Sequence, residues 1–160
     1  MGLEDEAGIK NSQSVINKLI EEEISTGIEE SRIILGGISQ GGAQAIYTTL
    51  TIPHTLGGLV ALSTFMPLRT EFCSFPPPFP FLVPTNCASL PNRDVPCLQV
   101  HGDTDLVIPL ATIGTATSLV LDELFTDFEF KVFNGLEHTI SLEELVYVKA
   151  FINEHLPANQ

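Results

Sequence analysis

Four short apolar segments alternate along the chain with longer segments whose apolar residues recur at helical spacing, and this alternation constrains the fold more than any other feature. Strands are expected over residues 32–38, 58–63, 97–101 and 128–133. Helices are expected over residues 4–26, 41–50, 110–124 and 141–155. Because strands separated by helices form right-handed βαβ units, we expect an α/β fold with a mostly parallel sheet and flanking helices.

The length of 160 residues suits one hydrophobic core, and we expect a single domain over residues 1–160. Residues 71–94 interrupt the pattern, because phenylalanines and prolines alternate there in a loop that is too long for a simple connection. We expect this Phe/Pro-rich segment to be an insertion outside the core. A docking site or a lid is the alternative interpretation.

The composition excludes several classes of partner. Twenty acidic residues against seven basic ones give a net charge of −13, which disfavours binding to a phosphate backbone, so no nucleic-acid partner is expected. Prolines in the uncharged stretch 72–92 rule out a spanning helix there, so no stable membrane insertion is expected. Cys73, Cys87 and Cys97 have no paired spacing, and we expect reduced thiols rather than a disulfide framework or a metal site.

Residues 37–41 form a G-x-S-x-G pattern between an expected strand and an expected helix. A serine on so sharp a turn has strained backbone geometry, and the glycines let strand and helix approach each other. The helix that follows directs its N-terminal N–H groups at the turn. Ser39 is therefore the candidate nucleophile. The alternative is a glycine-rich turn in which Ser39 only caps the helix.

A serine nucleophile needs a neutral imidazole to take its proton, and four histidines compete for that role. His54 and His155 are expected at the surface, and His101 ends a strand, where it can equally brace the turn. His138 lies in the loop after the last expected strand, and such loops carry the chemistry of parallel sheets. His138 is therefore the candidate base.

A catalytic histidine needs a carboxylate partner, and Asp103 and Asp105 both follow the third expected strand. The chain order of serine, aspartate and histidine is that of α/β-hydrolases, and differs from the chymotrypsin-like and subtilisin-like orders. Each of the three elements follows the carboxyl end of an expected strand. The pattern indicates a serine hydrolase that needs no metal and no organic cofactor.

Taken together, these motifs resemble the acyl-protein thioesterase family, whose members are also described as lysophospholipase-like and carboxylesterase-like hydrolases. The matching segments are residues 4–9 (EDEAGI), 32–43 (RIILGGISQGGA), 59–63 (LVALS) and 98–105 (LQVHGDTD), followed by Pro109, Gly135 and His138. In the family's H-G-x-x-D pattern the second aspartate is the acid. The resemblance therefore implies a triad of Ser39, Asp105 and His138, with the Gln40 N–H as an oxyanion donor.

The resemblance also implies a substrate class and a location. It implies hydrolysis of acyl thioesters on palmitoylated proteins, in the cytoplasm. A carboxylesterase or lysophospholipase acting on small acyl esters is the first alternative, because one triad serves both kinds of ester.

The resemblance further implies that an N-terminal part of the family fold is absent from this chain. The family has strands before the region that Glu4 matches, and their loop supplies a second oxyanion donor. We therefore expect an N-terminally truncated α/β-hydrolase, the C-terminal two-thirds of the family fold. Strand 32–38 then becomes an open edge through which the chain self-associates. A truncated, non-catalytic product is the second alternative.

Overall fold

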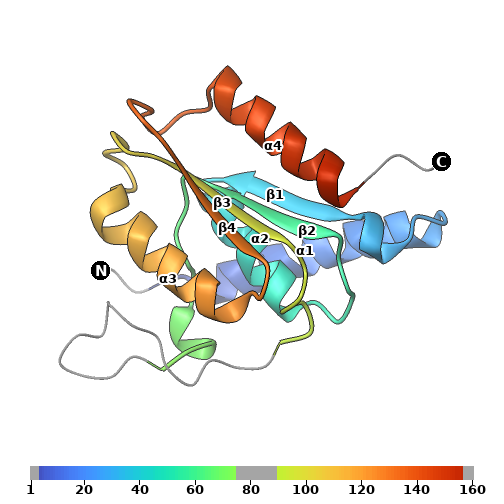
Figure 1. Cartoon of the computed structure of the whole chain (residues 1–160). Coiled ribbons are helices and arrows are strands. Elements are labelled where there is room, and N and C mark those ends of the chain that lie inside the picture. The colour runs from blue at the N-terminus through green and yellow to red at the C-terminus, as the bar shows by residue number, and fades with distance from the viewer. Residues whose placement is uncertain (1–3, 75–89, 157–160) are drawn as a thin grey trace.

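The computed structural model describes residues 4–74 and 90–156, and it has the expected α/β architecture (Figure 1). The elements are α1 (Glu6–Ser25), β1 (Ile34–Ile38), α2 (Gln40–Thr51), β2 (Gly58–Leu62), β3 (Cys97–Gly102), α3 (Thr115–Leu124), β4 (Phe128–Phe133) and α4 (Leu142–His155). Short 3-10 turns at Glu30–Arg32 and Arg69–Glu71 and a π-helical turn at Leu110–Gly114 complete the order. Helix α4 lies on one side of the sheet, and α1, α2 and α3 lie on the other (Figure 1).

The four described strands form one parallel sheet in the order β1-β2-β3-β4. The register aligns Ile38 with Leu62, Leu62 with Val100, and Val100 with Lys131. The carboxyl ends of the strands therefore meet along one edge of the sheet. Among the described residues, β1 is an outer strand and pairs only with β2.

The central strand β2 explains why these strands are apolar without alternation. All five of its residues are buried. Leu59 and Ala61 face the core under α2 and α3, whereas Val60 and Leu62 face the core under α4. Parallel strands covered on both faces need apolar residues at every position.

The helix limits follow from capping residues. Asp5 accepts a hydrogen bond from the Gly8 N–H at 2.9 Å and so begins α1. Gly27 follows the helix with φ of +100°, a conformation that favours glycine. Ser141 and Glu144 form a capping box at the start of α4.

The expectation that residues 71–94 lie outside the core is wrong at both ends of that segment. Phe72 is buried, and its ring meets the Tyr47 ring edge-on at 5.8 Å between centroids. Asn92 is fully buried, accepts a hydrogen bond from the Leu56 N–H and donates to the Thr49 carbonyl. These contacts join residues distant in sequence, which local composition does not predict. The middle of the expected insertion, residues 75–89, lies outside the described residues.

The expectation of reduced thiols throughout is wrong for Cys73, which is disulfide-bonded. An odd number of cysteines leaves room for one bridge, so the count alone does not exclude it. Cys97 is a free thiol at the start of β3, and burial raises its pKa well above the ordinary value. Cys97 is therefore an inert core residue.

Candidate active site

Ser39 lies between β1 and α2 in a strained conformation, with φ of +55° and ψ of −125°. Its N–H donates to the Leu62 carbonyl at 2.9 Å, which ties the turn to β2. Its carbonyl accepts hydrogen bonds from the Ala43 N–H at 3.0 Å and from the Thr64 hydroxyl at 2.6 Å. A non-glycine residue in this region persists only when its surroundings hold it, and these three bonds do so.

The glycines around Ser39 have different roles. A Cβ on Gly37 would lie 2.4 Å from the Gly41 carbonyl carbon, and a Cβ on Gly42 would lie 2.8 Å from the Gly37 oxygen and from Thr64 Cβ. A Cβ on Gly41 would meet no atom within 4 Å. The close approach of strand and helix therefore depends on Gly37 and Gly42. The expectation that Gly41 provides it is wrong.

The interpretation of Ser39 as a capping serine is also wrong. Although Ser39 occupies the N-cap position of α2, its side chain makes no capping hydrogen bond. The hydroxyl therefore does not cap α2. The α2 N-terminus begins at Gln40, so its free N–H groups and partial positive charge lie at the Ser39 turn.

Asp105 and His138 form a hydrogen-bonded pair. His138 Nδ1 donates to Asp105 Oδ2 at 2.7 Å, and Asp105 Oδ1 accepts from the N–H groups of Val107 and Ile108 at 2.8 Å each. The Asp105 carboxylate is buried, whereas the His138 side chain is 20% exposed. Since Nδ1 carries the donated proton, Nε2 of a neutral His138 is free to accept one.

The environment keeps Asp105 ionised. Burial acts to raise the pKa of this carboxyl, but the hydrogen bonds from His138, Ile108 and Val107 together outweigh burial. The net effect holds the Asp105 pKa below its ordinary value. An ionised carboxylate is the form that orients a histidine and stabilises an imidazolium.

The other candidates from the sequence have structural contacts. Asp103 accepts a hydrogen bond from the Gly135 N–H at 2.6 Å, which ties the loop after β3 to the loop after β4. His54 pairs with Glu30 at 2.7 Å, and the His155 ring packs against Phe151.

Ser39, Asp105 and His138 follow β1, β3 and β4, so all three lie at the carboxyl edge of the sheet. The structure joins Asp105 to His138, and no hydrogen bond of the described residues joins the Ser39 hydroxyl to His138. Hydrogen bonds between a catalytic serine and its base are often long without substrate and tighten when substrate binds.

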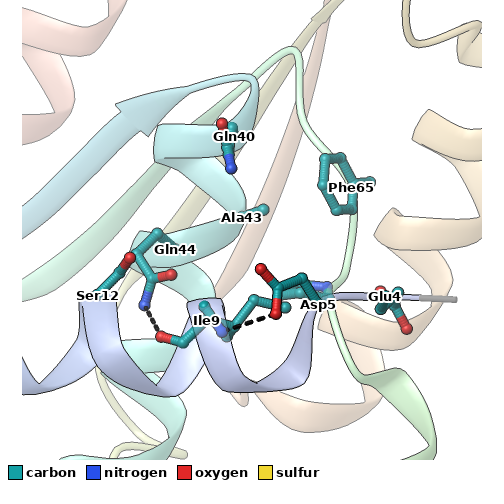
Figure 2. Close-up of a pocket in the computed structure, with 10 residues that line it drawn as sticks. Glu4, Asp5, Ile9, Ser12, Gln40, Ala43, Gln44 and Phe65 are labelled. Atoms are coloured by element: carbon teal, nitrogen blue, oxygen red, sulfur yellow. Dashed lines mark hydrogen bonds between the residues drawn. The ribbon is translucent and has the colours of Figure 1, made fainter.

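A cleft of about 250 Å³ adjoins the Ser39 turn (Figure 2). Its walls are the start of α1, the first turns of α2 and the loop after β2, through Glu4, Asp5, Gly8, Ile9, Ser12, Gln40, Ala43, Gln44, Phe65 and Pro67. Gln44 donates to the Ile9 carbonyl at 3.2 Å and so joins α2 to α1 beside the cleft (Figure 2). The lining mixes apolar surface with acidic and amide groups.

Comparisons with known proteins identify the family of this chain. Residues 1–156 match the model of the phospholipase/carboxylesterase family. Acyl-protein thioesterase 1 of Neurospora crassa is 37% identical over 154 residues, which cover 96% of this chain and 58% of that protein. Acyl-protein thioesterase 1 of Kluyveromyces lactis is also 37% identical over 154 residues, covering 95% of this chain and 62% of that protein.

The solved structure of SOBER1 from Arabidopsis thaliana superposes with a TM-score of 0.77 at 29% identity, covering 95% of this chain and 66% of that one. The chain belongs to the phospholipase/carboxylesterase family. The α/β-hydrolase fold and the resemblance deduced from the sequence are thereby confirmed. The chain spans about three fifths of the curated family members that it matches, at 58% and 62% of their lengths.

Sequence reasoning missed two contributors to the site of this family member. Thr64 holds the Ser39 carbonyl, and Phe65 lines the adjoining cleft. The only signal in the sequence was their position directly after the matching segment 59–63. Both lie in the loop after β2 and reach the site only through the tertiary fold, which spacing along the chain does not reveal.

The described part of the chain has neither a candidate metal site nor a candidate membrane-spanning helix. Residues 4–74 and 90–156 contain no cluster of three or more His, Cys, Asp or Glu side chains suited to a metal ion. In the same ranges, no helix is both long and apolar enough to cross a bilayer.

Proposed function

We propose that this chain is a serine hydrolase domain over residues 1–160 that cleaves acyl thioesters of palmitoylated proteins. Ser39 is the nucleophile, His138 the base, Asp105 the acid and the Gln40 N–H an oxyanion donor. The 2.7 Å bond from His138 Nδ1 to Asp105 Oδ2, at the sheet edge that carries the strained Ser39 turn, is the observation that carries the proposal. The similarity to the two acyl-protein thioesterases supports the substrate class.

The proposed mechanism is acyl transfer through a covalent intermediate. Ser39 Oγ attacks the thioester carbonyl while His138 Nε2 takes the hydroxyl proton, and Asp105 stabilises the imidazolium. The Gln40 N–H donates to the oxyanion at the start of α2. The thiolate leaves and receives the proton from His138. Water then attacks the acyl-serine carbonyl while His138 takes its proton. The ester bond to Ser39 breaks, the carboxylic acid leaves, and His138 returns the proton to Ser39 Oγ.

A carboxylesterase or lysophospholipase is the second candidate function, favoured by the description of the matching family. The same triad attacks oxygen esters and thioesters. Comparing kcat/KM for S-acyl and O-acyl substrates with identical acyl chains would separate the two. A non-catalytic product is the third candidate, because the chain spans only 58% and 62% of the relatives' lengths.

The decisive experiment is labelling with a fluorophosphonate, followed by peptide mapping. We expect covalent modification at Ser39 in the native chain and none in Ser39→Ala. Asp105→Asn should slow labelling about 10⁴-fold, the effect of the wrong histidine tautomer in a triad. Asp103→Asn is the matched control, since Asp103 bonds to Gly135 instead of His138. If Asp105→Asn labels at the native rate and Asp103→Asn does not label, Asp103 is the acid of the triad instead of Asp105.

We propose the cytoplasm as the location, as the family resemblance implies. Disulfide bonds are rare in reducing compartments, so the Cys73 disulfide gives this location a direct test. Alkylation of thiols in intact cells should modify Cys73 if the chain is cytoplasmic. Protection of Cys73 would indicate an oxidising compartment instead.

Substrates and partners are S-acylated proteins or small acyl esters, and the acidic surface disfavours nucleic acid. We further propose self-association through the outer edge of β1. The terminal position of β1 in the described sheet supports it.

A further inference from the structure

His101 is a fully buried histidine that the proposed triad does not use. It occupies the penultimate position of β3 (Cys97–Gly102), four residues before Asp105. Its Nε2 lies 2.8 Å from the Ile108 carbonyl oxygen and 3.6 Å from Asp105 Oδ2. The nearer contact is a hydrogen bond, and because a carbonyl only accepts, the proton resides on Nε2.

The bond to Ile108 connects His101 to the carboxylate. The Ile108 N–H donates to Asp105 Oδ1 at 2.8 Å, while the Ile108 carbonyl accepts from His101. The two peptide groups on either side of Ile108 are thus fixed, one to Asp105 and one to His101. Loop 105–108 is thereby closed around the carboxylate.

The fully buried imidazole ring of His101 packs against the backbone at Gly114. A Cβ on Gly114 would lie 2.9 Å from His101 Cε1 and 3.0 Å from Nδ1, so the backbone at Gly114 packs directly on the ring. Gln99 donates to the Gly114 carbonyl at 3.1 Å and holds that backbone in place. Gly114 therefore packs on the ring, and Gln99 holds Gly114 in position.

The other ring nitrogen makes no hydrogen bond. Nδ1 of His101 is buried without a partner among the described residues. The contact from Nε2 to the Ile108 carbonyl is therefore the hydrogen bond through which the ring acts on the loop.

We propose that His101 is a positioning residue for Asp105: its Nε2–H holds loop 105–108 so that two peptide N–H groups fix Asp105 Oδ1 and leave Oδ2 for His138. This inference rests on the proposed triad. Without the Nε2–H donor, the buried Ile108 carbonyl loses its partner and the loop relaxes. The carboxylate then loses the geometry that orients His138.

Two substitutions separate the donor from the volume of the ring. His101→Gln places an amide N–H the same number of bonds from Cβ as Nε2, so it can still reach the Ile108 carbonyl. His101→Met fills similar space without a donor. If His101→Met does not fold, His101→Asn replaces it, because its shorter amide does not reach.

The first measurement is independent of turnover. The proton NMR signal of the His138 Nδ1–H, shifted to low field by its bond to Asp105, should persist in His101→Gln and be lost in His101→Met.

The second measurement is the rate of hydrolysis of an S-octanoyl thioester. His101→Met should lower kcat about 10²-fold, as misplacement of a catalytic group by 1 Å does, with KM changed less than about twofold. His101→Gln should stay within about threefold of the native kcat, since its donor is retained.

Asn92→Leu is the control for a general loss of stability. Asn92 is fully buried and bonds to the backbone of Leu56 and Thr49, outside the proposed site. It should lower the melting temperature and leave both the NMR signal and kcat unchanged.

A folded His101→Met with a native signal and native kcat would overturn the inference. Equal loss in His101→Gln and His101→Met would also overturn it, because volume would then matter and the donor would not. A native chain that fails to label at Ser39 counts against the proposed function alone, since the NMR comparison still tests His101.

Discussion

The hydroxyl of Thr64 donates to the carbonyl oxygen of Ser39 at 2.6 Å, so a residue that follows β2 holds the turn that follows β1. The same Ser39 oxygen accepts from the Ala43 N–H in the first turn of α2. Strand, turn and helix are thus tied at one atom. The strained φ of +55° at Ser39 is therefore held by a contact from the loop after β2 as well as by one from α2.

Replacing Thr64 with valine tests that hydrogen bond. Thr64→Val keeps the shape and removes the donor, so we expect a loss of about 1 kcal/mol in unfolding free energy, the usual net value of one such bond. We also expect slower labelling of Ser39 by a fluorophosphonate. Thr64→Ser retains the hydroxyl and should restore the labelling rate. Equal rates in the valine and serine variants would contradict the role.

Gly41 and Gly42 offer a matched pair of neighbours. Gly42→Ala puts a Cβ 2.8 Å from the Gly37 oxygen, and the backbone must shift to accommodate it. We expect a loss of about 1–3 kcal/mol, as for other overpacked sites. Gly41→Ala meets no atom within 4 Å and should be neutral or slightly stabilising in the first turn of α2. Chemical denaturation measures both, and equal losses would show that the spacing at Gly42 is not the cause.

The Asp105 pKa predicts how stability depends on pH. The native pKa lies below the ordinary value of 3.8, so folding favours the ionised form of this carboxyl. Its stabilising contribution is complete above that ordinary value and is lost as the pH falls through the lower native pKa. The difference in unfolding free energy between the native chain and Asp105→Asn should therefore be constant near neutrality and shrink below pH 3.8. A difference that grows on acidification would show the opposite sign.

The sequence predicted the elements and their order well, because local periodicity and capping specify them. Helix α1 begins at the Asp5 cap and β4 occupies the expected 128–133. It did not distinguish Asp105 from Asp103 without the family resemblance. That distinction depends on how the loop after β4 folds back over β3, and no spacing along the chain encodes it.

Long-range packing was the other part that the sequence did not predict. The composition of residues 71–94 suggested a segment outside the core, yet Phe72 packs on Tyr47 from α2. A side chain's burial depends on which distant residues meet it. Proline content describes only the local backbone.

Asn92 should therefore be a stability determinant. Its side chain bonds to the Leu56 N–H and to the carbonyls of Thr49 and His54, each at 2.8–2.9 Å. Asn92→Leu leaves these buried groups unpaired, and we expect a loss of about 2–4 kcal/mol in unfolding free energy. Asn153→Ala on the exposed face of α4 is the control and should change stability by less than about 0.5 kcal/mol. A loss below about 1 kcal/mol for Asn92→Leu would show that Asn92 is not a stability determinant.

The outer edge of β1 leads to the last prediction. The Ser39 N–H donates to Leu62 on β2, and successive residues of a strand direct their N–H groups to opposite sides. The N–H groups of residues 34, 36 and 38 therefore face away from β2. Among the described residues no strand pairs with that side. Unpaired backbone beside half-buried isoleucines is a template for a second strand, and we expect two copies to associate there as concentration rises.

Gly36→Pro removes one outward N–H and leaves the ladder to β2 intact, so it should shift sedimentation velocity profiles towards the monomer. Gly36→Ala keeps the N–H and should associate like the native chain. A native chain that sediments as a monomer at every concentration, or a Gly36→Pro variant that associates equally well, would rule out pairing through β1.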